Sequence, residues 1–151
     1  MSAGWFRRTD EQTRRGNPRP HLRAKALVLS DGKQRFTLVT ADLLGFPPPF
    51  KEEVVKALND PDCTLDSLIL LPSHSHGSIE TNAFHSGNDY KIPQLGIFSA
   101  PVHKLVLEKF VAVIRNASKN LVPVQVGTVS NQIAGWNRNR RHQEATPTTM
   151  K

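Results

Sequence analysis

Two histidines separated by one residue, His74 and His76, are the side chains in this sequence best suited to chemistry. They occur in LILLPSHSHGS (68–78), where an apolar run ends at Pro72. In extended backbone, residues two apart point to the same side, so both imidazoles can face one point. Imidazole is a common zinc ligand, and catalytic zinc sites use three protein ligands and leave one position open. The pair predicts part of a zinc site, although two polar residues that begin a surface loop would show the same pattern.

The strands expected around the pair would place it at the edge of a sheet. The apolar run 67–73 is short and continuous, as in a buried strand, and the histidines follow its carboxyl end. Open α/β sheets tend to bind their ligands beyond the carboxyl ends of their strands. Two further β-rich runs, 23–30 and 34–44, are separated by Asp31-Gly32, which is a strong hairpin signal.

Two helices are expected to pack on these strands. The segment 51–60 has glutamates near its start and apolar residues on one face, and 99–120 repeats apolar residues at helical spacing after a candidate N-cap, Ser99. Between strand and helix, 73–98 is expected to be a long loop without regular structure. Alternating valines predict a last strand at 122–130. The order of elements predicts an α/β fold, with a mixed sheet and helices packed on it.

Composition narrows the class of protein. The chain of 151 residues is long enough for one domain, and its single cysteine, Cys63, excludes a disulfide framework. The acidic neighbours of Cys63 predict an inert thiol. No apolar stretch is long enough to span a bilayer, and the basic N-terminus lacks the apolar core of a signal peptide. The sequence divides into a basic irregular arm (1–22), an α/β core (23–130) and a basic C-terminal segment (131–151).

The net charge of +7 comes from the two ends of the chain. Residues 1–25 hold seven basic and two acidic residues, 138–151 hold four and one, and 26–137 hold nine and ten. Basic arms could bind nucleic acid, line a polar pocket or be solvated tails. The arginines are not interleaved with aromatic residues that could stack on bases, which speaks against nucleic acid. A nucleic-acid-binding module and a non-catalytic interaction module remain the alternatives to an enzyme.

The ordered segments resemble the neutral/alkaline (non-lysosomal) ceramidase family, in part of its N-terminal catalytic domain. The similarity runs through HLRAKALVLSDGKQRFTLVTADLLG (21–45), LILLPSHSHGS (68–78), the long helix and VPVQVGTVSNQIAGWNRNRR (122–141). In that family a hairpin ends in an Asp-containing stretch, the next strand runs into a His-x-His turn, and an Asn-Arg motif follows. The resemblance implies an amidohydrolase that uses one zinc ion to cleave a lipid amide such as N-acyl-sphingosine.

The resemblance also implies roles for individual residues. His74 and His76 would be zinc ligands, and Asn137 and Arg138 would match the Asn-Arg motif that contacts the substrate. Arg138 would steady the substrate or the charge that develops on its oxygen. Asp42 would orient a zinc-binding imidazole through its second ring nitrogen. The plain alternatives are a solvated arginine in a basic tail and an aspartate that forms a turn at a strand end.

The departures from the family pattern predict an incomplete domain. The turn reads HSHGSIE, where the family has His-x-His-Ser-Gly-Pro, so Gly77 and Ser78 are transposed and the proline is missing. The family's third zinc histidine lies beyond the Asn-Arg motif, which leaves His85 and His103 as the nearby candidates here. Without a signal peptide the chain is expected in the cytoplasm, whereas family members are often secreted or associated with membranes. Contact with a membrane surface is compatible with a lipid substrate.

Overall fold

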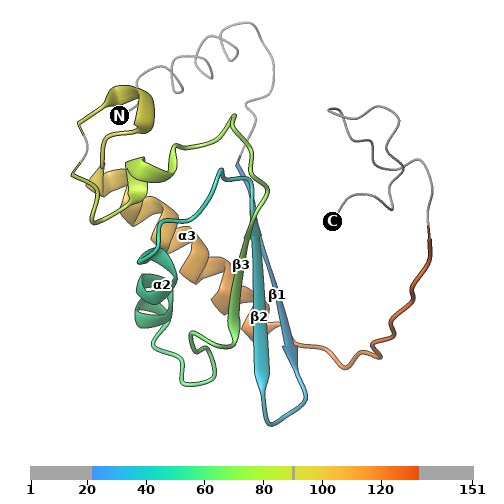
Figure 1. Cartoon of the computed structure of the whole chain (residues 1–151). Coiled ribbons are helices and arrows are strands. Elements are labelled where there is room, and N and C mark those ends of the chain that lie inside the picture. The colour runs from blue at the N-terminus through green and yellow to red at the C-terminus, as the bar shows by residue number, and fades with distance from the viewer. Residues whose placement is uncertain (1–21, 90, 133–151) are drawn as a thin grey trace, which may run out of the picture. The chain divides into compact units, whose positions relative to one another are not determined.

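A three-stranded mixed sheet forms the centre of the structure. The computed structural model describes residues 22–89 and 91–132 of the 151 (Figure 1). The strands β1 (Ala24–Ser30), β2 (Arg35–Ala41) and β3 (Leu68–Pro72) lie side by side in that order. The first two strands are antiparallel and the last two are parallel, which confirms the predicted α/β class.

The turn between β1 and β2 confirms the hairpin predicted from Asp31-Gly32. The Asp31 carboxylate accepts hydrogen bonds from the backbone N–H groups of Lys33 (2.8 Å) and Gln34 (2.7 Å). Gly32 has a φ of +88°, a backbone conformation that other residues adopt only at a cost. The local chemistry of four residues therefore fixes the register in which the two strands pair.

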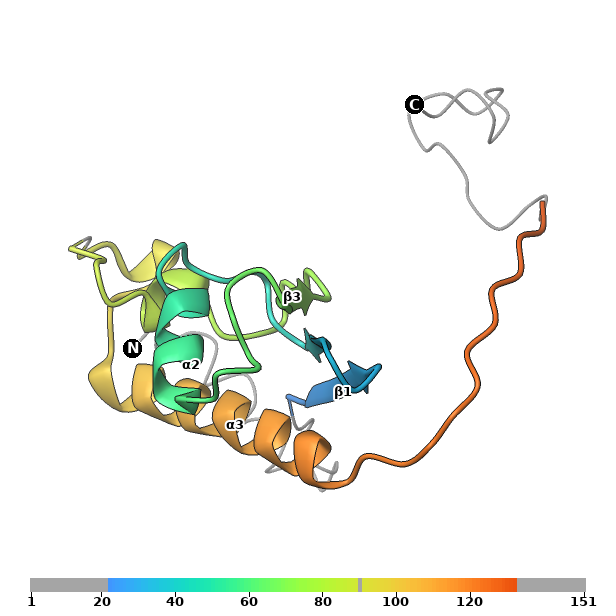
Figure 2. The same ribbon diagram turned by 90° about the horizontal axis from the view of Figure 1, so that it is seen from below.

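Two helices cover one face of the sheet, as Figure 2 shows. The helix α2 (Phe50–Leu58) connects the parallel strands, and α3 (Ala100–Lys119) lies against β1 and α2. α2 ends at Asn59, whose φ is +48° and whose N–H donates to the Val55 carbonyl at 3.2 Å. Neither helix, nor any other described helix, combines the length and apolar character needed to cross a membrane.

The core lies between the sheet and the two helices. Its centre is a group of aromatic rings in which Phe50 contacts Phe84 and Phe110 edge to face, at centroid distances of 5.4 and 5.2 Å. Aliphatic side chains of the strands, including Val39 and Leu68, complete this layer. Cys63 is buried in the same cluster, and burial raises the pKa of its thiol, in keeping with the inert cysteine predicted from the sequence.

The long segment before α3 is more ordered than the sequence predicted. It contains two short 3-10 helices, η1 (Thr81–Phe84) and η2 (Pro93–Leu95), and η1 places Phe84 in the core. Gly96, after η2, has a φ of +87°, and a Cβ added there would lie 2.9 Å from the Glu80 Cβ. A glycine is therefore required for the segment to fold back on η1.

The strand predicted at 122–130 is not formed. The structure assigns it no secondary structure, and its valines are 65 to 96% exposed. A strand needs a hydrogen-bonding partner as well as an alternating pattern, and no described strand pairs with this segment. The chain divides after Leu121 into two units, Met1–Leu121 and Val122–Lys151, so the segment begins a unit of its own.

One residue of the predicted apolar face of α3 is also exposed. The apolar residues that recur at helical spacing in 99–120 are Val102, Leu105, Val106, Phe110, Val113, Ile114 and Ala117. Of these, Leu105 is 51% exposed, whereas Val111, which lies outside this set, is buried. The helix therefore turns a slightly different stripe toward the sheet. Ser99 does occupy the N-cap position, in extended backbone, but its side chain makes no capping hydrogen bond.

Candidate metal centre

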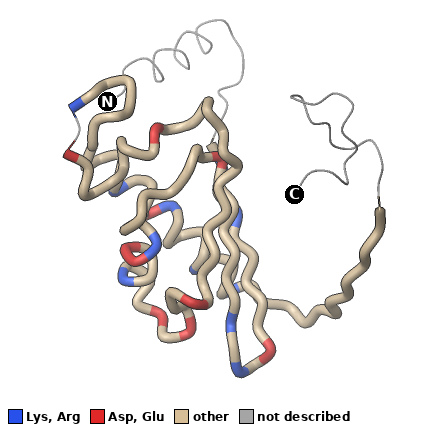
Figure 3. Tube along the Cα trace, in the orientation of Figure 1, with Lys and Arg blue, Asp and Glu red and all other residues tan. Residues whose placement is uncertain are grey.

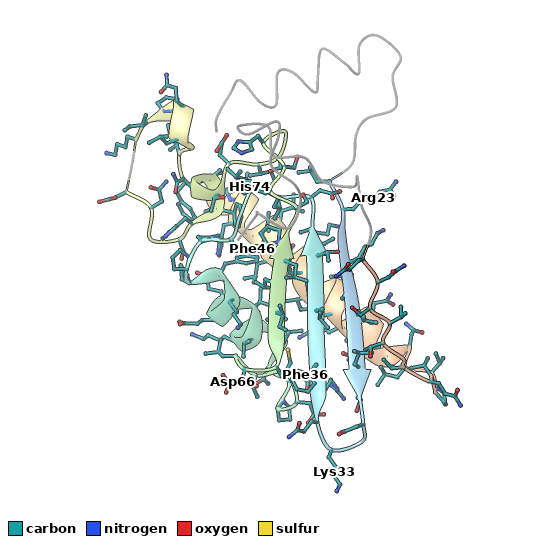
Figure 4. The ribbon with its side chains drawn as sticks, turned by 45° about the vertical axis from the view of Figure 1, so that its right-hand side comes forward. Arg23, Lys33, Phe36, Phe46, Asp66 and His74 are labelled. Atoms are coloured by element: carbon teal, nitrogen blue, oxygen red, sulfur yellow. The ribbon has the colours of Figure 1, made fainter. Side chains whose placement is uncertain are left out.

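The two loops that follow the parallel strands β2 and β3 lie together at the carboxyl end of these strands. The parallel pairing continues past both strands, because the Ser73 N–H donates to the Ala41 carbonyl (2.9 Å) and the Ser75 N–H donates to the Leu43 carbonyl (3.3 Å). The backbone that carries the histidines is therefore held against the loop that follows β2. Figure 4 shows His74 at this end of the sheet.

His74 is held by its backbone and by one hydrogen bond. Its φ is +58°, and the only other described non-glycine residue with a positive φ is Asn59. Its Nδ1 lies 3.0 Å from the Leu44 carbonyl oxygen. A carbonyl can only accept, so Nδ1 carries a proton, and in the neutral form of the imidazole the lone pair is then at Nε2. An unusual backbone conformation and a fixed tautomer are together typical of a functional side chain.

The two imidazoles lie close together, although not through the extended backbone that the sequence predicted, because His74 has a positive φ. The ring centroids of His74 and His76 are 5.0 Å apart, and the ring planes are nearly perpendicular at 86°. With Zn–N bonds of about 2.0–2.1 Å, two imidazoles on one tetrahedral zinc have centroids roughly 5 Å apart. Both residues are exposed to solvent. The ring separation is therefore compatible with two ligands on one ion.

The buried hydroxyl of Ser78 fastens the turn that carries the histidines. Ser78 is 2% exposed, and its Oγ donates toward the carbonyl oxygens of Ser75 (2.7 Å) and Ile79 (3.3 Å). A buried hydroxyl of this kind stabilises the loop because its hydrogen-bonding capacity is satisfied. Sequence reasoning noted Ser78 only as a departure from the family pattern. A serine directly after His-Gly gave no signal of this structural role.

The two histidines proposed as third ligands are engaged elsewhere. His103 Nε2 lies 2.7 Å from Glu53 Oε2, and the two side chains are 19 and 24% exposed. His85 Nδ1 accepts the Gly87 N–H at 2.9 Å. Among the described residues there is no group of three or more His, Cys, Asp or Glu side chains that could hold a metal ion. Within the described part of the chain, His74 and His76 therefore stand as a pair and not as a group of three.

Glu53 links three parts of the fold. It accepts a hydrogen bond from Ser86 Oγ at 2.5 Å as well as the bond to His103, so α2, α3 and the segment between η1 and η2 meet at one carboxylate. Partial burial acts to raise the pKa of Glu53. The hydrogen bonds from His103 and Ser86, with electrostatic contributions from His103 and His85, outweigh it and lower that pKa.

Asp42 is used differently from the sequence prediction. Its Oδ2 accepts the Arg23 N–H at 3.0 Å and its own N–H donates to the Arg23 carbonyl at 2.9 Å, so it fastens the start of β1 to the end of β2. The hydrogen bond expected from Asp42 to a histidine is supplied to His74 by the Leu44 carbonyl. Asn137 and Arg138, the predicted substrate contacts, lie outside the described residues.

A second polar region lies at the opposite end of the sheet. Lys33, Arg35, Asp62 and Asp66 help to line a surface hollow of about 310 Å³. The Arg35 guanidinium bridges Asp60 (3.0 Å) and Asp62 (3.1 Å), so its charge is already neutralised. Figure 3 shows that charges of both signs are mixed along the described trace. The ion pairs of Arg35 fasten the loop 60–62 to β2. The charged residues that line the hollow balance one another, and the hollow lies at the end of the sheet opposite to the histidines.

Comparisons with known proteins identify no relative of this chain. No protein-family model, no curated protein and no solved structure matches it.

Proposed function

We propose that this chain carries part of the site of a zinc-dependent amide hydrolase of ceramidase type, with a lipid amide such as N-acyl-sphingosine as substrate. The observation that carries the proposal is the hydrogen bond from His74 Nδ1 to the Leu44 carbonyl, made by a ring whose centroid lies 5.0 Å from that of His76. Zinc-binding histidines usually donate their second N–H to a carbonyl or carboxylate in this way. The sequence resemblance supplies the reaction class.

The residues present fit zinc in type and in spacing. Imidazole nitrogens are preferred zinc ligands, and the ring separation of 5.0 Å matches two ligands on one ion. Zinc, when bound, supplies a Lewis acid that polarises an amide carbonyl and lowers the pKa of water. His74 and His76 would hold the ion, and the guanidinium of Arg138 would stabilise negative charge on the carbonyl oxygen, beside Asn137.

Asp42 enters the proposal as a positioning residue. Its two hydrogen bonds to Arg23 fix the end of β2, and the Leu44 carbonyl that orients His74 follows two residues later. Asp42 would therefore act on the imidazole through the backbone of its loop. Replacing Asp42 by Asn should weaken zinc binding less than replacing either histidine, because the ligands themselves remain.

Zinc-dependent amide cleavage by the full chain tests the proposal. A fluorescent N-acyl-sphingosine is incubated with dilute protein and excess zinc, and fatty-acid release is followed. We expect hydrolysis that stops on chelation, returns with zinc and is lost in His76→Ala. His85→Ala, which changes a histidine outside the pair, is the control and should retain activity. Failure of the chain to retain zinc, together with no hydrolysis, would refute the proposal.

A further inference from the structure

We infer that two copies of this chain bind one zinc ion together, through His74 and His76 of each copy. The resulting site has four histidine ligands and no open position. The inference rests on the zinc-binding part of the proposed function, and it adds a partner, a second copy of the chain, and a means of regulation.

The number of ligands is the first reason. Zinc in proteins is almost always tetrahedral, with four ligands in closed sites and three protein ligands in catalytic ones. The described residues offer His74 and His76, and no third side chain joins them. His103 and His85 make the hydrogen bonds described above, to Glu53 and to the Gly87 N–H. A second copy brings a matching pair that completes the tetrahedron.

The surroundings of the pair are the second reason. Residues 67–79 contain no charged side chain, so two copies can bring these loops together without repulsion between like charges. β3, which leads into the pair, lies at one edge of the described sheet, and the preceding Leu71 is 42% exposed. A contact across a two-fold axis uses the same patch twice, and a small uncharged patch with two ligands suits this arrangement.

The shared ion would control access to the proposed site. Four histidine ligands leave no coordination position for water or substrate, so the shared form is closed. When zinc exceeds the protein, each pair can hold its own ion, and the two copies separate with a position open. The ratio of zinc to protein would then set the fraction of chains able to bind substrate. The closed form contains half a zinc ion per chain and the open form contains one.

The mass of the full chain measured by light scattering during zinc titration tests the inference. We expect a monomer in EDTA, a doubled mass that peaks near half a zinc per chain, and a return toward the monomer with excess zinc. His76→Ala should remain monomeric at every ratio. His74→Asn should do the same, and it keeps a residue that tolerates left-handed backbone. His85→Ala is the matched control and should dimerise as the natural sequence does.

Each other result overturns the inference in a distinguishable way. A monomer that binds one zinc per chain at all ratios would contradict sharing but leave the proposed function standing, with its third ligand elsewhere in the same chain. A dimer that survives EDTA or His76→Ala would show that zinc does not bridge the copies. A chain that binds no zinc would refute both proposals. Circular dichroism of each variant shows whether the fold is retained.

Discussion

The histidines of the described residues lie in two different settings, one between helices and one at the surface. His103 is mostly buried between helices, and its ring bonds to the Glu53 carboxylate across 50 residues of sequence. His74 and His76 are exposed, and the only side-chain hydrogen bond identified for the pair joins His74 to the backbone carbonyl of Leu44. A histidine that bonds to a partly buried carboxylate of another helix holds the two helices together. A histidine whose Nδ1 is bonded to a backbone carbonyl can offer its other nitrogen to a ligand, which is the role proposed for His74.

Zinc affinity should show the largest difference between the two arrangements. His76→Ala removes a ligand and should lower the affinity at least about 100-fold, more than the loss of an orienting partner costs. His103→Ala leaves the pair intact and should change the affinity less than about threefold. Competition with a chelating dye measures both variants. Equal losses in the two would mean that His103 joins the metal site.

The free energy of unfolding without zinc should show the opposite order, with a larger effect at the Glu53–His103 contact than at His76. Glu53→Ala leaves His103 and Ser86 without their partner and should lower the free energy of unfolding by about 2 kcal/mol. His76→Ala changes an exposed side chain and should alter it by less than about 0.5 kcal/mol. Urea unfolding in EDTA compares the two. A large drop in the free energy of unfolding of His76→Ala would mean that this residue stabilises the fold.

The sequence predicted the elements whose signals are local. The Asp31-Gly32 turn, the short apolar strand before His74 and the helix at 99–120 each carry their pattern within a few residues, and the structure forms all three. The strand predicted as buried is, however, an edge strand of the described sheet, and its Ile69 and Leu71 are each 42% exposed. The predicted strand at 122–130 has the right alternation but no described partner, because pairing is a property of the whole sheet.

The contacts that shape the site were hidden from the sequence for a different reason. Leu44 acts through its backbone carbonyl, an atom that every residue has, so its side chain gave no indication. Glu53 and His103 lie 50 residues apart and meet only because α2 and α3 pack on the same face of the sheet. The type and spacing of the two neighbouring histidines could be predicted. The Leu44 carbonyl as the partner of His74, and the Glu53 carboxylate as the partner of His103, could not be predicted.

The dependence of stability on pH sharpens the role of Glu53. The folded state lowers its pKa below the ordinary 4.5 despite partial burial, through the hydrogen bonds and charges described above. A carboxylate whose pKa is lower in the folded state stabilises the fold at pH values above its pKa in the unfolded chain. This contribution is lost as the pH falls through the pKa of the folded state. The stability gap between the natural chain and Glu53→Gln should therefore narrow below pH 4.5. Urea unfolding at several pH values measures it, and a gap that widens would contradict the assignment.

The smallest expected effect concerns the backbone of His74. Glycine removes the cost of about 1 kcal/mol that a side chain incurs in left-handed backbone, although it also gives the unfolded chain more freedom. The lost bond to Leu44 is exposed and can be replaced by water. These contributions nearly cancel, so the free energy of unfolding of His74→Gly should lie within about 0.5 kcal/mol of that of the natural chain. The same is expected of the control Asn59→Gly. Because zinc binding should fail in His74→Gly alone, a stable fold without zinc would show that this backbone conformation serves the ligand. A loss above about 1 kcal/mol in His74→Gly would instead place His74 with His103, among the residues that hold the fold.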